Sequence, residues 1–96
     1  MSWDVEIVNN SFGGIQRRYK FSNGLCLSAV QDFMSYGNRE YMGEKGQWEI
    51  AVLDPKGNFK TKDIFPDADD DVIGWLDFNR VYELVHVIDD YKEIVL

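Results

Sequence analysis

Four aspartates, Asp67, Asp69, Asp70 and Asp71, fall within five positions, and carboxylates at this spacing can do three kinds of chemistry. They can coordinate a divalent cation, transfer protons in general acid–base catalysis, or imitate the phosphates of a nucleic acid. They can also do no chemistry and form the polar entrance to a helix, where the helix dipole stabilises acids. The rest of the chain has to separate these hypotheses.

The calcium hypothesis rests on Asp67, Asp69 and Asp71, which have the Asp-x-Asp-x-Asp spacing of an EF-hand loop. That loop also requires glycine at its sixth position and glutamate at its twelfth, because these residues set its geometry. This chain has Val72 and Phe78 there. We therefore expect no metal site, and since the chain has no phosphate loop, nucleophile elbow or Cys-x-x-Cys motif, we expect no cofactor.

An enzymatic or ligand-binding module is the alternative, with the carboxylates near Asp70 acting together with Tyr36 or His86. His86 is the only histidine of the chain, and its place between two valines predicts a structural or solvent-facing role. Cys26 lies in an apolar run and is predicted to be a small buried hydrophobe. A structural protein with no separate activity is a further alternative.

Net charge is −7 over the 96 residues, and it is unevenly distributed. Residues 1–62 carry seven acids and eight bases, a net of +1, whereas residues 63–96 carry ten acids and two bases, a net of −8. Such a surface repels nucleic acids and anionic membranes and attracts basic proteins. Direct nucleic-acid binding is thus disfavoured, and the short basic segment at residues 17–20 is interpreted as an outward strand face.

The expected setting is the cytoplasm. The chain has no apolar run of membrane-spanning length and no signal-peptide pattern at its start. Its single cysteine cannot form an internal disulfide, which fits a reducing compartment. We expect a soluble protein that makes no membrane contact.

One domain spanning residues 1–96 is expected, with a β-rich first part. Apolar and polar residues alternate along several segments, which is typical of half-buried strands. Asn23-Gly24 indicates a hairpin, and residues 54–57 have proline at the second position of a turn. The predicted strands cover residues 3–7, 15–21, 25–30, 48–53 and 58–63.

The spacing of apolar residues changes from two to three or four in the last third of the chain. This pattern follows Asp77, which is a good N-cap. This pattern predicts a helix over residues 78–91, with residues 72–76 as a short helical turn leading into it. The acids at 69–71 would then lie at a helix N-terminus. The predicted fold is α+β: an antiparallel β-meander of four or five strands with one C-terminal helix packed on one face. The apolar stripe consists of Phe78, Val81, Tyr82, Val85, Ile88 and Tyr91, widened by Leu84 and Val87.

Residues 34–46 contain three glycines and are predicted to form a long loop. Tyrosine and methionine are enriched in protein contacts, so this loop is a candidate anchor for a partner, while the acidic third steers the encounter. A loop folded back on the core and a merely solvated acidic face are the alternatives. The predicted partner surface comprises Tyr36, Arg39, Tyr41, Met42, Asp67, Asp69, Asp70 and Asp71.

Nucleic-acid mimicry is the most specific form of this hypothesis. It requires the acids of residues 67–71, together with Asp77, Glu83, Asp89 and Asp90, to line one surface at phosphate-like spacing.

A resemblance adds a biological setting. Phe21-Ser22-Asn23-Gly24, Ser35-Tyr36-Gly37, Trp48-Glu49-Ile50-Ala51-Val52-Leu53 and Asp70-Asp71-Val72-Ile73-Gly74-Trp75-Leu76 follow one another here. This succession resembles a family of small bacteriophage proteins with the pattern F-x-N-G … S-Y-G … W-E-x-A-V-L … D-D-V-I-G-x-L, whose members generally have no assigned function. The resemblance implies a phage product that acts in the infected bacterial cytoplasm, and the partner expected from the charge is a host or phage protein with a basic surface. This chain differs by an added N-terminal strand, an insert near residues 38–46 and a five-residue tail.

Overall fold

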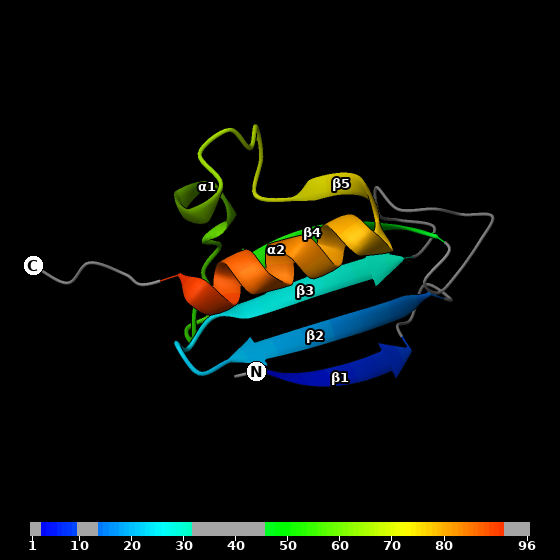
Figure 1. Cartoon of the computed structure of the whole chain (residues 1–96), viewed down its shortest axis with the longest axis horizontal. Coiled ribbons are helices and arrows are strands. Elements are labelled where there is room, and N and C mark those ends of the chain that lie inside the picture. The colour runs from blue at the N-terminus through cyan, green and yellow to red at the C-terminus, as the bar shows by residue number, and fades with distance from the viewer. Residues whose placement is uncertain (1–2, 10–13, 32–45, 92–96) are drawn as a thin grey trace, which may run out of the picture.

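The computed structural model describes residues 3–9, 14–31 and 46–91, which form a five-stranded antiparallel sheet and two helices (Figure 1). Each strand pairs with the next along the chain, so the sheet order is β1-β2-β3-β4-β5. The predicted α+β meander with a C-terminal helix on one face is confirmed. The elements are β1 Trp3–Asn9, β2 Ile15–Phe21, β3 Cys26–Gln31, β4 Gln47–Leu53, α1 Thr61–Ile64, β5 Ile73–Asp77 and α2 Phe78–Asp90.

Helix α2 begins where the sequence predicts it. Asp77 is its N-cap, and the carboxylate Oδ1 of Asp77 accepts a 2.7 Å hydrogen bond from the backbone N–H of Arg80. The helix ends one residue before the predicted end, with Tyr91 as its C-cap. Its buried residues are Val81, Leu84, Val85 and Ile88, whereas Tyr82 and Val87 are exposed, so the buried stripe is narrower than predicted.

The sheet buries the face that α2 covers. Side chains of the middle strands form this core together with the buried side of the helix, and Trp48, 1% exposed, is among its largest members. Among the described residues the indole N–H of Trp48 finds no acceptor. The core residues of the strands are Tyr19, Phe21, Leu27, Ala29, Trp48, Ile50 and Val52.

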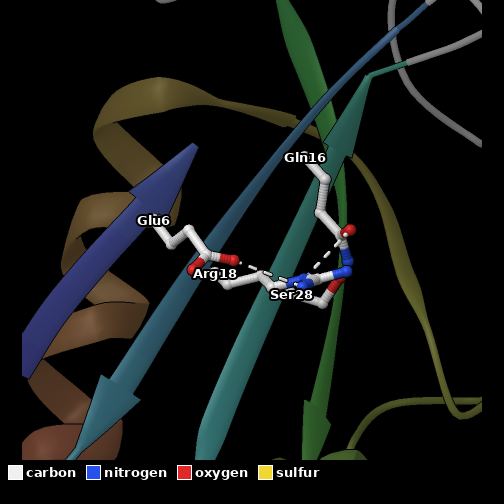
Figure 2. Close-up of polar contacts among 4 residues, drawn as sticks. All are labelled: Glu6, Gln16, Arg18 and Ser28. Atoms are coloured by element: carbon white, nitrogen blue, oxygen red, sulfur yellow. Dashed lines mark hydrogen bonds and ion pairs between the residues drawn. The ribbon is translucent and has the colours of Figure 1, made fainter. Parts of the chain in front are cut away.

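The opposite face of the sheet is polar. Arg18 pairs with Glu6 of the neighbouring strand at 3.3 Å, and Gln16 donates a 2.7 Å hydrogen bond to the hydroxyl of Ser28, as Figure 2 shows. Arg18 therefore lies on an outward strand face, as predicted. Arg17 does not, because its guanidinium lies 5.0 Å from the ring centroid of Phe78 on the helix side.

Residues 22–25 join β2 to β3 and confirm the predicted hairpin. Gly24 has φ +90° and its N–H donates to the carbonyl of Phe21 at 3.1 Å. Glycine adopts this left-handed conformation without a steric penalty. Asn23 then connects the turn to the distant helix: its amide donates to the carbonyls of Ile88 at 2.8 Å and Tyr91 at 3.1 Å. The hairpin thereby satisfies the C-terminal end of α2.

Residues 58–63 were predicted as a strand, and this is wrong. Only Phe59 pairs, in an isolated bridge with Leu53, before α1 begins at Thr61. The reason lies in the edge of β4. The N–H of Lys60 donates to the carbonyl of Val52 at 2.7 Å, and the hydroxyl of buried Thr61 accepts from the N–H of Val52 at 2.9 Å. Both outward backbone groups of Val52 are therefore paired, the carbonyl as acceptor and the N–H as donor, and no ladder continues.

Residues 72–76 do not form the predicted helical turn, because β5 occupies Ile73–Asp77. Leu76 pairs with Trp48 and Ile73 pairs with Ile50, so three steps along β5 match two steps along β4. The extra residue makes a β-bulge, which re-aims side chains locally. Ile73 and Leu76 both pack against the core. Their spacing of three residues is the spacing expected of a helix, which explains the wrong prediction. The acids at 69–71 therefore precede a strand rather than a helix.

Replacing Val85, which is fully buried, with aspartate should destabilise the fold by about 3 kcal/mol or more, because the charge would face the sheet without a partner. Urea unfolding measures this. Val87→Asp is the matched control on the exposed side of α2 and should change stability by less than about 1 kcal/mol. Equal losses in the two variants would show that the helix face is assigned wrongly.

Asn23→Ala should lower stability by about 1 kcal/mol, because it removes the hydrogen bonds between the hairpin turn and the end of α2. Ser22→Ala changes the neighbouring exposed residue and should stay within about 0.5 kcal/mol of the parent. Amide exchange near residue 88 should accelerate only in the Asn23 variant. Unchanged exchange there would mean that the turn does not cap the helix.

Candidate functional site

The four predicted aspartates lie in the connection between α1 and β5. Asp67, Asp69 and Asp70 are exposed and Asp71 is half-buried. The carboxylate of Asp70 accepts a 2.7 Å hydrogen bond from the N–H of Asp71, which fixes the local backbone. The structure thus brings these acids together on the surface. We call residues 67–71 the acidic segment.

A cleft of about 530 Å³ lies beside the acidic segment, bounded by α1, β5 and α2. Its walls combine apolar side chains, such as Phe65, Leu76 and Leu84, with the carboxylates of the segment. Arg80 is the one base among its lining residues, and it pairs with Glu83 at 2.9 Å. The opening of the cleft is therefore electronegative.

Trp75 projects from the bulge of β5 between Gly74 and Leu76, two residues that line the cleft. Its side chain is 53% exposed, and its φ of +59° makes it the one non-glycine residue with positive φ in the described part of the chain. A bulky residue in the left-handed region costs about 1–2 kcal/mol. The fold therefore maintains a strained backbone that displays a tryptophan to solvent beside an acidic cleft.

Sequence reasoning missed Trp75 as a surface residue. It was placed in the predicted helical turn at residues 72–76, although an isolated glycine within a strand-like run is a recognised signal for a bulge. Gly74 gives that signal here. Reading the bulge at Gly74 would have placed Ile73 and Leu76 on one face and Trp75 outside it.

The loop half of the predicted partner surface consists of Tyr36, Arg39, Tyr41 and Met42. These residues lie outside the described residues. Their part in binding stays a prediction.

The catalytic alternative paired Asp70 with Tyr36 or His86, and Tyr36 lies outside the described residues, so only the pairing with His86 can be compared with the structure. His86 is exposed and its ring lies 5.1 Å from that of Trp3 in β1 and 4.8 Å from that of Tyr82. Asp70 lines the cleft beside β5, the other edge of the sheet. The structure does not bring His86 and Asp70 together.

The described residues provide neither a reactive cysteine nor a metal-binding cluster. Cys26 is half-buried, and burial raises the pKa of its thiol, which disfavours the thiolate. Within residues 3–9, 14–31 and 46–91, no group of three His, Cys, Asp or Glu side chains could hold a metal ion.

A second cleft, of about 910 Å³, lies between the β2–β3 turn and the turn at residues 54–58. Asp54 lines it and is the carboxyl with a depressed pKa. The N–H of Asn58, 2.9 Å from Oδ1, is the main cause, and the N–H of Lys56 adds to it. These bonds close the turn. Asp54 therefore has a structural role. The residues that line its cleft include both acids and bases, so the cleft has no predominant charge.

The acids that mimicry requires are dispersed. Asp77 caps the N-terminus of α2, and Glu83 pairs with Arg80. Asp89 and Asp90 lie at the other end of this 13-residue helix, about 20 Å away at the usual rise per residue. Glu83 lies near the middle of the helix, so these acids are spread along its whole length, and mimicry stays a prediction.

Trp75→Gly and Trp75→Ala test the strained backbone. Both remove the indole, but only glycine adopts the left-handed conformation freely, so the glycine variant should be more stable than the alanine variant by about 1 kcal/mol. Paired urea unfolding curves measure the difference. A glycine variant less stable than the alanine variant would contradict the bulge geometry, because glycine is the weaker residue in a regular strand.

No helix of the described part of the chain is long and apolar enough to cross a membrane. Comparison of the chain with family models, curated proteins and solved structures finds no match in any of the three. The resemblance to the phage proteins accordingly stays a prediction.

Proposed function

We propose that this chain is a small protein-interaction domain that binds a basic surface of another protein through Trp75 and the acidic segment. The observation that carries the proposal is the exposure of Trp75 from a strained bulge beside the acidic cleft. Strain of this kind persists where the surrounding structure enforces it, and it concentrates at functional positions. Tryptophan is also among the residues that contribute most to interface energies.

Charge and anchor have separate tasks in this proposal. The net charge of −8 over residues 63–96 attracts a basic partner at long range and raises the association rate. At short range the indole of Trp75 loses water against the partner, which lowers the dissociation rate. Such an arrangement favours a binding role over catalysis.

The biological setting comes from the phage resemblance. A phage accessory factor with an acidic binding surface would occupy a host protein in the bacterial cytoplasm and inhibit or redirect it. A protein with a basic functional site is the partner that the charge favours.

The proposal is tested by capturing partners from bacterial lysate on the immobilised full chain and measuring the binding kinetics of the purified partner. Asp69→Asn combined with Asp70→Asn should slow association and flatten its salt dependence, because these acids lie at the cleft. Trp75→Gly should instead speed dissociation and weaken binding by about 2 kcal/mol, roughly thirtyfold in Kd.

The matched control is Asp63→Asn combined with Asp90→Asn, which removes the same charge from exposed positions that line neither the cleft nor β1. It should bind like the parent. If the control pair weakened binding while the cleft pair and Trp75→Gly did not, the interface would lie elsewhere and the proposal would be wrong.

A further inference from the structure

Strand β1 forms the edge of the sheet opposite β5, and in the described part of the chain only β2 pairs with it (Figure 1). Its seven residues run in register with β2 from Trp3, opposite Phe21, to Asn9, opposite Ile15. An edge strand presents a row of backbone groups that can pair with another chain.

The hairpin fixes which backbone groups of β1 face outward. Phe21 directs its N–H to the carbonyl of Leu25 in the β3 direction, at 3.0 Å. Because this direction alternates along an antiparallel strand, Lys20 and Arg18 direct their backbone groups toward β1. Their register partners Asp4 and Glu6 complete those pairs. Val5 and Ile7 therefore direct their N–H and C=O groups away from β2, to the outer edge of the described sheet.

The two faces of β1 have different chemistry. On the helix side, Val5 lies opposite the core residue Tyr19, and Val5 and Ile7 are 42% and 61% exposed. On the polar side, Asp4 lies opposite Lys20 and Glu6 opposite Arg18. Figure 2 shows the second of these pairs, which measures 3.3 Å. Strand β2 thus already opposes the acids of β1 with bases.

We propose that the outer edge of β1 accepts an extended segment of another protein in which basic and apolar residues alternate, as an added antiparallel strand. Its backbone would bond with Val5 and Ile7, its apolar side chains would pack on the same two residues, and its bases would lie beside Asp4 and Glu6. This surface is distinct from the cleft of the proposed function.

Charge selects this partner over a second copy of the chain. Two β1 strands paired with each other would place Asp4 and Glu6 beside the same acids of the other copy, and like charges at neighbouring positions of a sheet are destabilising. A basic segment turns the same positions into attractive pairs. The acids of β1 therefore oppose self-association and favour a basic strand.

The test uses the full chain and a capped peptide in which lysine and valine alternate over about seven residues, the length of β1. Amide hydrogen exchange is followed residue by residue during titration. Exchange should slow at Val5 and Ile7, whose N–H groups face outward, and change little at Asp4 and Glu6, which already pair with β2. The effect should saturate and weaken with salt.

Two control peptides test the pattern: one has the same lysines and valines in two blocks, and the other alternates glutamate with valine. Neither should protect Val5 and Ile7. Equal protection by the block peptide would show that charge alone causes the effect, and it would contradict the proposal. No protection by the alternating lysine peptide would overturn it as well. Dimerisation of the parent through β1, detected by sedimentation, would overturn it too.

Ile7→Pro removes one outward N–H from an edge position, where proline is tolerated, so the chain should stay folded and lose the peptide response. Ile7→Thr keeps the N–H and should retain a weakened response. Asp4→Asn combined with Glu6→Gln leaves the backbone unchanged and should weaken binding and flatten its salt dependence. Trp75→Gly should respond like the parent. If Ile7→Pro or the neutralised pair bound the peptide as tightly as the parent, β1 would not be the docking strand.

Discussion

Strand β5 has to bury two apolar side chains three residues apart, Ile73 and Leu76, on one face of a sheet whose residues alternate between faces. A regular strand cannot do this, and the bulge at this position resolves the conflict by adding one residue. Three other features depend on it. The bulge directs Trp75 to solvent, β5 pairs along the edge of β4, and Asp77 comes to the point where it both ends the strand and caps α2.

The packing of α2 on one face of the sheet then determines which surfaces remain for binding. Helix α2 buries one face of the sheet, and Asn23 ties its far end to the β2–β3 turn. The two outer strands, β1 and β5, remain at the edges of the sheet. Both have acids beside exposed apolar groups. At β5 the acids lie in a loop next to a cleft, whereas at β1 they alternate with valine and isoleucine along the strand. The first arrangement suits a globular basic surface and the second suits an extended segment.

Local patterns in the sequence predict much of this fold. The alternation in β2, the Asn-Gly turn and the stripe of α2 each depend on neighbouring residues, and each appears close to its predicted place. The misassigned segments depend on distant partners. Residues 58–63 are redirected by hydrogen bonds to Val52, and residues 72–76 acquire helical spacing from a bulge against β4. For the site, composition indicated the acidic segment, but the exposure of Trp75 follows from a register shift that no local pattern specifies.

The most direct measurement concerns residues 72–77 themselves, by nuclear Overhauser contacts in the full chain. A bulged edge strand predicts cross-strand contacts between Leu76 and Trp48 and between Ile73 and Ile50, with a positive φ at Trp75. Strong contacts between successive amides through residues 72–76, together with contacts three residues apart and none to β4, would show a helical turn instead. That result would contradict the bulge and the display of Trp75 that depends on it.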